Sequence, residues 1–291
     1  MTGPLLDILD SSASPEAVAW LRDTLARLRK DFQRRAFYYA FSGVSRRFDK
    51  RARVAPSAGQ RAAVEKLAPG VSVDGWDEFR LARVALLVEL AGQPAATYRD
   101  TLVSVLNTAD LREQVAIFSA FPLLPEPEFL VPMARDGLRS NIVDIFDSIA
   151  LGNPFPAARF DEEAWNQMVL KALFISRPLH RVAGFDARAN PALAEALAYL
   201  AHERWSAGRY VSPELWRGCA SQLTDAIAAD LARVAADPDP AQRQAAALVV
   251  AANPGHEKLA PLAETLAPEI ARVRSGDLTW DSLGASLATA A

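Results

Sequence analysis

Apolar residues recur along most of the chain at spacings of three and four residues, the period of one face of an α-helix. The first clear stretch begins at Ser14 and Pro15, a pair suited to the N-terminus of a helix. Its apolar face then carries Val18, Leu21, Leu25 and Leu28. β-Branched residues rarely alternate with polar ones, so strands with their two-residue period are not expected. The pattern therefore predicts an all-α protein.

Further helical segments follow one another with short turns between them. A second helix is expected at about 31–41, with Gly43 as its stop. A strongly apolar helix is expected to begin at Asp74 and to end at Gly92 in a left-handed conformation. The remaining helices are expected at about 95–107, 110–120, 127–138, 141–151, 161–175, 191–206, 213–234, 240–252 and 261–274.

So many helices joined by short turns exceed one four-helix bundle and favour stacked antiparallel helix pairs. We therefore expect residues 1–291 to form a single domain, an α-solenoid of HEAT-like character. Segments 112–122 and 243–254 both place an Arg early in an apolar helix that ends at a Pro. The Asp-Pro-Asp-Pro at 237–240 resembles a turn between the helices of such repeats. Since no clear period emerges, an irregular multi-helix bundle is the alternative.

Charge narrows the classes of partner. The net charge of −3 argues against a nucleic-acid-binding protein, whose affinity usually comes from a basic surface. The N-terminal helices, residues 1–53, depart from this average, because residues 22–53 hold eleven Arg and Lys against three Asp. This excess could contact a phosphorylated ligand, an acidic partner or, peripherally, a membrane surface. The alternative is a basic face that is simply solvated.

One cysteine and the absence of a long apolar stretch indicate the compartment. Cys219 excludes an internal disulfide, fits a reducing cytosol and is expected to lie in the core. Residues 1–14 lack the basic and apolar regions of a secretory signal, and no later stretch approaches 18 uncharged apolar residues. We therefore expect a cytoplasmic protein that is neither secreted nor membrane-spanning.

The segment 139–217 concentrates polar residues in and beside helices that are expected to be buried. In the helix 161–175, apolar residues occupy most of the circumference and leave little solvent face for Asn166 and Lys171. Lys171 could bind an anionic group, act as a base or extend to water along its stem. The candidate ligand-binding residues of this segment are Asn141, Asp144, Asn166, Lys171, His180, Arg188, His202, Arg204, Trp205 and Trp216.

The helix 191–206 offers the candidates for chemistry. Arg204 falls on the apolar stripe of this helix and is expected to need an internal carboxylate or a pair of ligand oxygens. His202 lies three residues from Trp205, so both could border one cleft. His202 is then a candidate acid or base, or a hydrogen-bonded scaffold residue. Asn141 and Asp144 lie on a polar helix face that is either solvated or turned toward Lys171 and Arg204.

No motif announces a metal or a cofactor. His202-Glu203 resembles the start of a His-Glu-x-x-His zinc motif, but position 206 is Ser. The other histidines, His180 and His256, stand at no ligand spacing. A Gly-rich phosphate loop, a Gly-x-Ser-x-Gly elbow and a Cys and His pairing are also missing. We predict neither a metal site nor a cofactor.

Several linked motifs together resemble the EboA family. They are Trp165-Asn166-Gln167-Met168-Val169-Leu170-Lys171-Ala172-Leu173-Phe174-Ile175, Pro178-Leu179-His180-Arg181, Arg188-Ala189-Asn190-Pro191, His202-Glu203-Arg204-Trp205 and Pro213-Glu214-Leu215-Trp216-Arg217. The detailed resemblance covers residues 139–217. It implies a place in the ebo gene cluster, beside a prenyltransferase-like membrane protein, a dehydroquinate-synthase-like cyclase, and metal-hydrolase-like and sugar-isomerase-like enzymes. In cyanobacteria this cluster is associated with moving a scytonemin precursor toward the periplasm, and EboA itself has no established reaction.

Two hypotheses follow. The first is a non-catalytic accessory protein that binds a small polar or prenylated metabolite, or other ebo-cluster proteins, in a cleft of segment 139–217. The second is an enzyme acting on such a metabolite, with His202 as acid or base and with Lys171, Arg188 and Arg204 holding an anion. The absence of a recognised catalytic motif favours the first.

Overall fold

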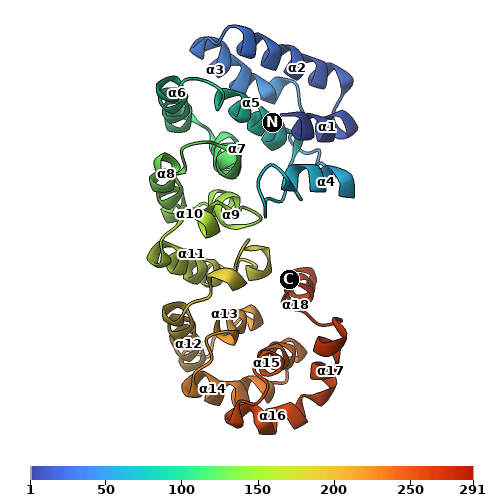
Figure 1. The fold of residues 1–291 in the computed structure, drawn as a ribbon, viewed down its shortest axis with the longest axis vertical. Helices are drawn as coiled ribbons and strands as arrows, with labels where there is room; N and C mark the ends of the chain where they lie inside the picture. Colours follow the sequence, from blue (N-terminus) through green and yellow to red (C-terminus); the bar gives the residue numbers. More distant parts are fainter. Residues whose placement is uncertain (1, 291) are drawn as a thin grey trace. The chain divides into compact units, whose positions relative to one another are not determined.

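The computed structural model describes residues 2–290, and its regular elements there are helical (Figure 1). Eighteen α-helices and six short 3₁₀ helices account for these elements, and no β-strand occurs between residues 2 and 290. The prediction of an all-α protein is confirmed. Within the same range, no helix is long and apolar enough to cross a lipid bilayer.

The chain folds into two compact units, Met1–Phe160 and Asp161–Ala291. This boundary lies inside the polar segment 139–217, so the segment is shared between the two units. The prediction of a single domain stays a prediction.

The helices of the first unit surround one strongly apolar helix, α5 (Glu78–Leu90), which is buried on almost every side. Its neighbours are α1, α2, α3 and α7, and α7 in turn packs against α9. Figure 1 shows α5, α7 and α9 in this order, with α6 and α8 beside them. The remaining elements of this unit are α1 (Gly3–Ser12), α2 (Pro15–Lys30), α3 (Arg34–Gly43), η1 (Val44–Arg46), α4 (Ala58–Glu65), α6 (Ala95–Thr108), α7 (Leu111–Ala120), η2 (Phe121–Leu123), α8 (Pro127–Arg139), α9 (Val143–Ala150) and α10 (Phe155–Arg159). This stacking is compatible with a solenoid and with a bundle.

The ends of these helices correct two predictions. The apolar helix begins after Asp77, not at Asp74, because the Asp77 side chain accepts the Arg80 N–H at 2.8 Å and so caps α5. Gly92 lies in a turn without positive φ, so it is no left-handed stop. Gly43 ends α3, as predicted, with φ −66°, and it leads directly into η1. Helix α1 was not predicted, although its four core leucine and isoleucine residues are buried.

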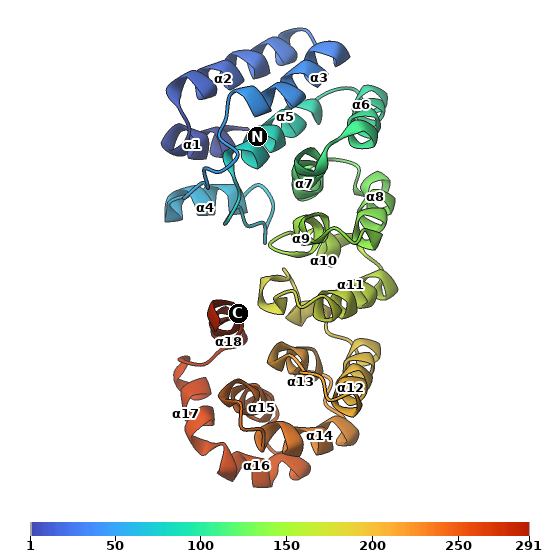
Figure 2. The ribbon, with the colours of Figure 1, turned by 180° about the vertical axis from the view of Figure 1, so that it is seen from behind.

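The second unit surrounds α15 (Pro240–Ala252), which packs against α13, α14, α17 and α18. Figure 2 shows this helix inside the ring of its neighbours. The other elements are α11 (Glu162–Phe174), η3 (Leu179–Arg181), η4 (Asp186–Arg188), α12 (Pro191–Ser206), η5 (Pro213–Trp216), α13 (Arg217–Ala220), α14 (Asp225–Ala235), η6 (Glu257–Leu259), α16 (Ala260–Thr265), α17 (Ala267–Ser275) and α18 (Trp280–Ala290). The C-terminal helix α18 was not predicted, and it packs against η3 and α15.

Two predicted long helices are each broken. The segment 213–234 divides into η5, α13 and α14, because the Thr224 hydroxyl accepts the Ile227 N–H at 3.3 Å and caps a new helix. The segment 261–274 divides at Leu266, since Pro268 in the first turn of α17 cannot continue the hydrogen bonding of α16. The break before α14 matters for the candidate site.

Cys219 lies in the core of the second unit, as predicted, with its Sγ 3.7 Å from the carbonyl oxygen of Ala194. Burial raises the pKa of its thiol to about 12. Because the thiolate is the reactive form, the native protein should not react with Ellman's reagent at pH 8. In guanidinium chloride the single thiol should react fully. Rapid labelling of the native protein would contradict this burial.

Candidate functional site

A cavity of about 410 Å³ opens between α12 and α14 in the second unit. This volume lies within the range of small-molecule sites in proteins. Apolar and polar side chains share its surface, as is typical of such sites. Its eleven lining residues are Pro191, Ala194, Glu195, Ala198, Tyr199, His202, Gln222, Thr224, Ala226, Ile227 and Asp230.

The local sequence explains why α12 presents this face. The helix begins at Pro191, where the Asn190 side chain accepts the Leu193 N–H at 2.9 Å. Leu193 and Leu197 are fully buried in the core. The residues of α12 that line the cavity are spaced three and four residues apart, so they form one line along the helix beside these two leucines. Small alanines in this line leave the space that forms the cavity.

His202 and Asp230 join the two helices across this space. His202 Nε2 lies 2.8 Å from Asp230 Oδ1, and the side chains are 53% and 17% exposed respectively. An ionised aspartate only accepts hydrogen bonds, so Nε2 donates the proton. In the neutral imidazole this leaves Nδ1 as an acceptor. A carboxylate that orients a histidine in this way can serve either a binding site or acid-base chemistry.

Aromatic stacking fixes the plane of the His202 ring. The Trp205 ring stacks on it with centroids 5.6 Å apart, and the buried Trp216 stacks on Trp205 at 5.8 Å. The Arg233 guanidinium lies over the Trp205 ring, 4.3 Å from its centroid. His202 and Trp205 are therefore adjacent, as expected from their spacing. His202 lines the cavity, whereas Trp205 supports it from behind.

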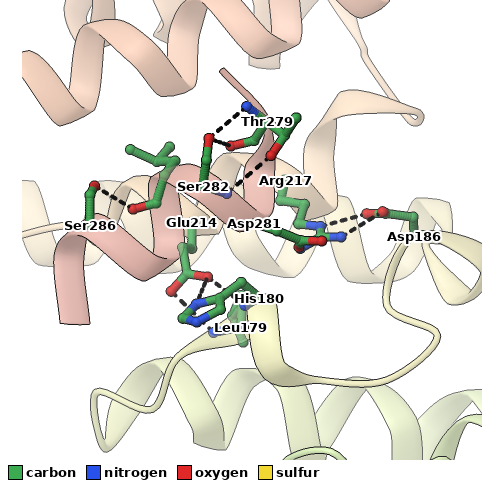
Figure 3. Close-up of polar contacts among 10 residues, drawn as sticks. Leu179, His180, Asp186, Glu214, Arg217, Thr279, Asp281, Ser282 and Ser286 are labelled. Atoms are coloured by element: carbon green, nitrogen blue, oxygen red, sulfur yellow. Dashed lines mark hydrogen bonds and ion pairs between the residues drawn. The ribbon is translucent and has the colours of Figure 1, made fainter. Parts of the chain in front are cut away.

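His180 is part of a buried cluster near the C-terminal helix (Figure 3). Its Nδ1 lies 3.1 Å from Glu214 Oε1, and the Glu214 carboxylate also accepts the backbone N–H groups of Leu179 and His180. Gly284 of α18 packs directly on both side chains. Beside them, Arg217 binds Asp186 through two nitrogens at 2.7 Å and Asp281 at 2.9 Å. This cluster ties η3, η5 and α18 together.

Asn166 has a structural partner. Its side-chain amide and that of Asn190 donate to each other, at 3.1 and 2.9 Å. Asn190 is also the residue that caps α12. The pair therefore fixes the start of the cavity-lining helix to α11. Asn166 acts on the cavity through this helix and does not line it.

The three candidate cations lie away from the cavity lining. Arg204 donates through Nε to the backbone carbonyl of Tyr210 at 2.6 Å, and of its two expected partners the internal carboxylate is not found among residues 2–290. The Arg188 guanidinium lies 5.1 Å from the centroid of the Trp165 ring and donates to the carbonyl of Asp161. Lys171 is half-buried on α11, whose solvent face is wider than predicted because Phe174 is 69% exposed.

Asn141 and Asp144 belong to the first unit and are exposed at the start of α9. The polar face predicted for this helix extends from Asn141 and Asp144 to Ser148, and it is interrupted because Ser148 is buried and donates to the carbonyl of Ile145 at 2.7 Å. A role for Asn141 and Asp144 toward Lys171 and Arg204 stays a prediction.

The basic segment 22–53 forms α2, α3 and the residues after them in the first unit. Three of its arginines take carboxylate partners: Arg22 pairs with Asp10, Arg29 with Glu89 and Arg34 with Asp100. Two more lie over aromatic rings, Arg35 over Tyr39 and Arg47 over Trp20. A peripheral membrane contact through this surface stays a prediction.

Of the His202–Asp230 pair, the sequence pointed only to His202. Asp230 was placed inside one long helix 213–234, and no spacing in the sequence connects it to His202. Glu195 and Tyr199 were missed as well, although the spacing of three to His202 places Tyr199 close to it on α12. Glu214, which holds His180, stands in one of the motifs quoted above. Among residues 2–290, no cluster of three His, Cys, Asp or Glu side chains could hold a metal ion.

These features define an all-helical protein with a cavity that is large enough for a small molecule. A comparison with protein families gives a match over residues 1–220 to the family described as metabolite traffic protein EboA. The chain belongs to the EboA family, which confirms the resemblance seen in its motifs. No curated protein and no solved structure matches the chain. The family match includes α12, whereas α14 lies beyond it.

The family's description supports a role connected with a metabolite, through an interaction with the metabolite itself or with a partner. It names no reaction. The family's description therefore leaves open which residues of the chain bind a metabolite.

The docking of α18 can be tested at Gly284. A Cβ added there would lie 2.2 Å from His180 Nδ1 and 2.6 Å from Glu214 Oε1. Gly284→Ala should therefore lower the free energy of unfolding by about 1–3 kcal/mol, measured by urea denaturation. Gly59→Ala should instead raise it by about 0.5–1 kcal/mol, because Gly59 lies in the first turn of α4 and a Cβ there would meet no atom within 4 Å. If both variants gain stability, α18 does not pack on this cluster.

Proposed function

We propose that this protein is a non-catalytic accessory protein that binds a small metabolite in the cavity between α12 and α14. The observation that carries the proposal is the cavity itself, which combines a fixed His202–Asp230 pair with an apolar surface. The family's description as metabolite traffic protein supports a role in metabolite synthesis or trafficking. Other ebo-cluster proteins are the proposed partners, and a scytonemin-precursor-type metabolite is the proposed cargo in cyanobacteria.

The surface of the cavity suits a ligand with both polar and apolar parts. Alanines from both helices and Ile227 supply the apolar area. His202, Gln222 and Thr224 supply polar groups that can orient a bound molecule. The stack of Trp205 and Trp216 holds His202 in place before any ligand arrives, which lowers the entropic cost of binding.

Filling the cavity tests the proposal. Ala226 is an exposed lining residue, so Ala226→Trp should fold and should weaken the binding of small probes at least tenfold. Ala229→Trp is the matched control, since Ala229 is exposed on the same helix but does not line the cavity. The probes are 2-phenylethanol and geraniol, one aromatic and one prenyl alcohol, titrated by ligand-observed NMR. If neither probe binds, or if both variants behave alike, the cavity is not a binding site.

One observation favours an enzyme as the second candidate. The His202–Asp230 distance of 2.8 Å is that of a histidine oriented by a carboxylate, in which Nδ1 could take a proton from a substrate while Asp230 stabilises the imidazolium. Lys171, Arg188 and Arg204 are not among the residues that line the cavity. The version of the enzyme hypothesis in which these cations hold an anion beside His202 therefore lacks geometric support.

Metabolite output distinguishes the two functions. In cells that depend on the ebo cluster for a product, His202→Gln should retain a substantial part of the output, because a glutamine keeps polar contacts in a binding site. An enzyme that uses His202 as acid or base should lose about 10²-fold or more. Lys171→Met serves as the companion variant away from the cavity. Loss of output in a folded His202→Gln protein, with Lys171→Met unaffected, would favour catalysis.

A further inference from the structure

We infer that the cavity between α12 and α14 takes a ligand that donates hydrogen bonds and carries no negative charge, of the class of aromatic amines and alcohols. This inference rests on the proposed function, because it assumes that the cavity binds a small molecule. It adds the charge and the shape of that molecule. Three features of the lining residues carry it.

The first feature is the sign of the charges around the cavity. Glu195 and Asp230 bring two carboxylates to the lining, whereas none of the eleven lining residues is Lys or Arg. The neighbouring cations have other partners: Arg233 lies over the Trp205 ring, and Lys258 pairs with Asp225 at 3.0 Å. An anionic ligand would meet two carboxylates and no lysine or arginine in the lining, which disfavours its binding.

The second feature is the direction of hydrogen bonding. Once His202 Nε2 donates to Asp230, the neutral ring offers only the acceptor Nδ1. Glu195 is exposed and has no ion pair within residues 2–290. Its carboxylate oxygens are therefore available to accept hydrogen bonds from a ligand. The Thr224 hydroxyl and the Gln222 amide can adapt to either role. A ligand that presents O–H or N–H groups therefore satisfies more of this surface than one that presents only acceptors.

The third feature is the shape of the apolar surface. Ala194, Ala198 and Ala226 keep the space between the helices clear, so a flat group can approach both of them. Tyr199 stands at the rim with 66% of its surface exposed, and no aromatic ring stacks on it within the described chain. An exposed tyrosine ring favours an aromatic partner, and its face also attracts an ammonium group. An aromatic amine combines both properties.

A series of three probes with the same ring tests the inference at pH 7. Phenethylamine carries a positive charge, 2-phenylethanol is neutral and phenylacetate is negative. Titration of the full chain by ligand-observed NMR should give the tightest binding for the amine and at least tenfold weaker binding for phenylacetate. Glu195→Gln should reduce the preference for the amine over the alcohol by a factor of about three or more. Glu203→Gln removes the same charge from an exposed position of α12 outside the cavity, and it should leave the preference unchanged.

The outcomes separate this inference from the proposed function. Suppose that 2-phenylethanol binds the native protein, that Ala226→Trp weakens this binding, and that phenylacetate binds as tightly as phenethylamine. The cavity is then a binding site, as proposed, but the inference about the charge of its ligand is wrong. Equal effects of Glu195→Gln and Glu203→Gln would also overturn it, because the preference would then reflect net charge alone. If none of the three probes binds but geraniol does, the inference falls and the proposed function stands; if geraniol does not bind either, both fail.

Discussion

Each unit of this protein depends on one helix that is buried on nearly all sides. In the first unit this helix is α5, and in the second it is α15, whose alanines and valines from Ala245 to Val250 are buried. A helix without a solvent face can be stable only if other helices cover its whole circumference. This requirement explains why α1, α2, α3 and α7 gather around α5 and why α13, α14, α17 and α18 gather around α15.

Polar groups at these central helices must find partners inside the protein, since burial without hydrogen bonds is costly. Gln242 of α15 donates to the backbone carbonyl of Val211 at 2.6 Å and so holds the loop that follows α12. Arg83 of α5 lies between the rings of Phe41 and Phe79, near Glu113, and burial lowers the pKa of its guanidinium. Such contacts connect the central helix to loops that its apolar surface alone would not position.

The cavity is a consequence of the packing around α15. Because α14 begins anew at its Thr224 cap, it packs against α15 and brings Asp230 opposite His202 of α12. In the same packing, most of the polar residues that stand out in the sequence find hydrogen-bond partners within the protein. His180 is held by Glu214, Asn166 by Asn190 and Arg204 by a backbone carbonyl. What is left beside the cavity is an acidic and hydrogen-bond-accepting surface, which differs from the anion site that the abundance of cations suggested.

The sequence by itself determined the helical class of the protein, the bounds of its regular longer helices such as α6, α8, α12 and α15, the core position of Cys219 and the family, because these follow from local periodicity, caps and motifs. It also marked His202 and Trp205 as neighbours, since both lie on one short stretch of helix. Only the tertiary structure decided that Asp230 faces His202 and that Lys171 and Arg188 do not line the cavity. The physical reason is that the packing of helices from distant segments determines such partners. The solvent-exposed cap at Thr224 begins the separate helix α14, whose packing places Asp230 opposite His202.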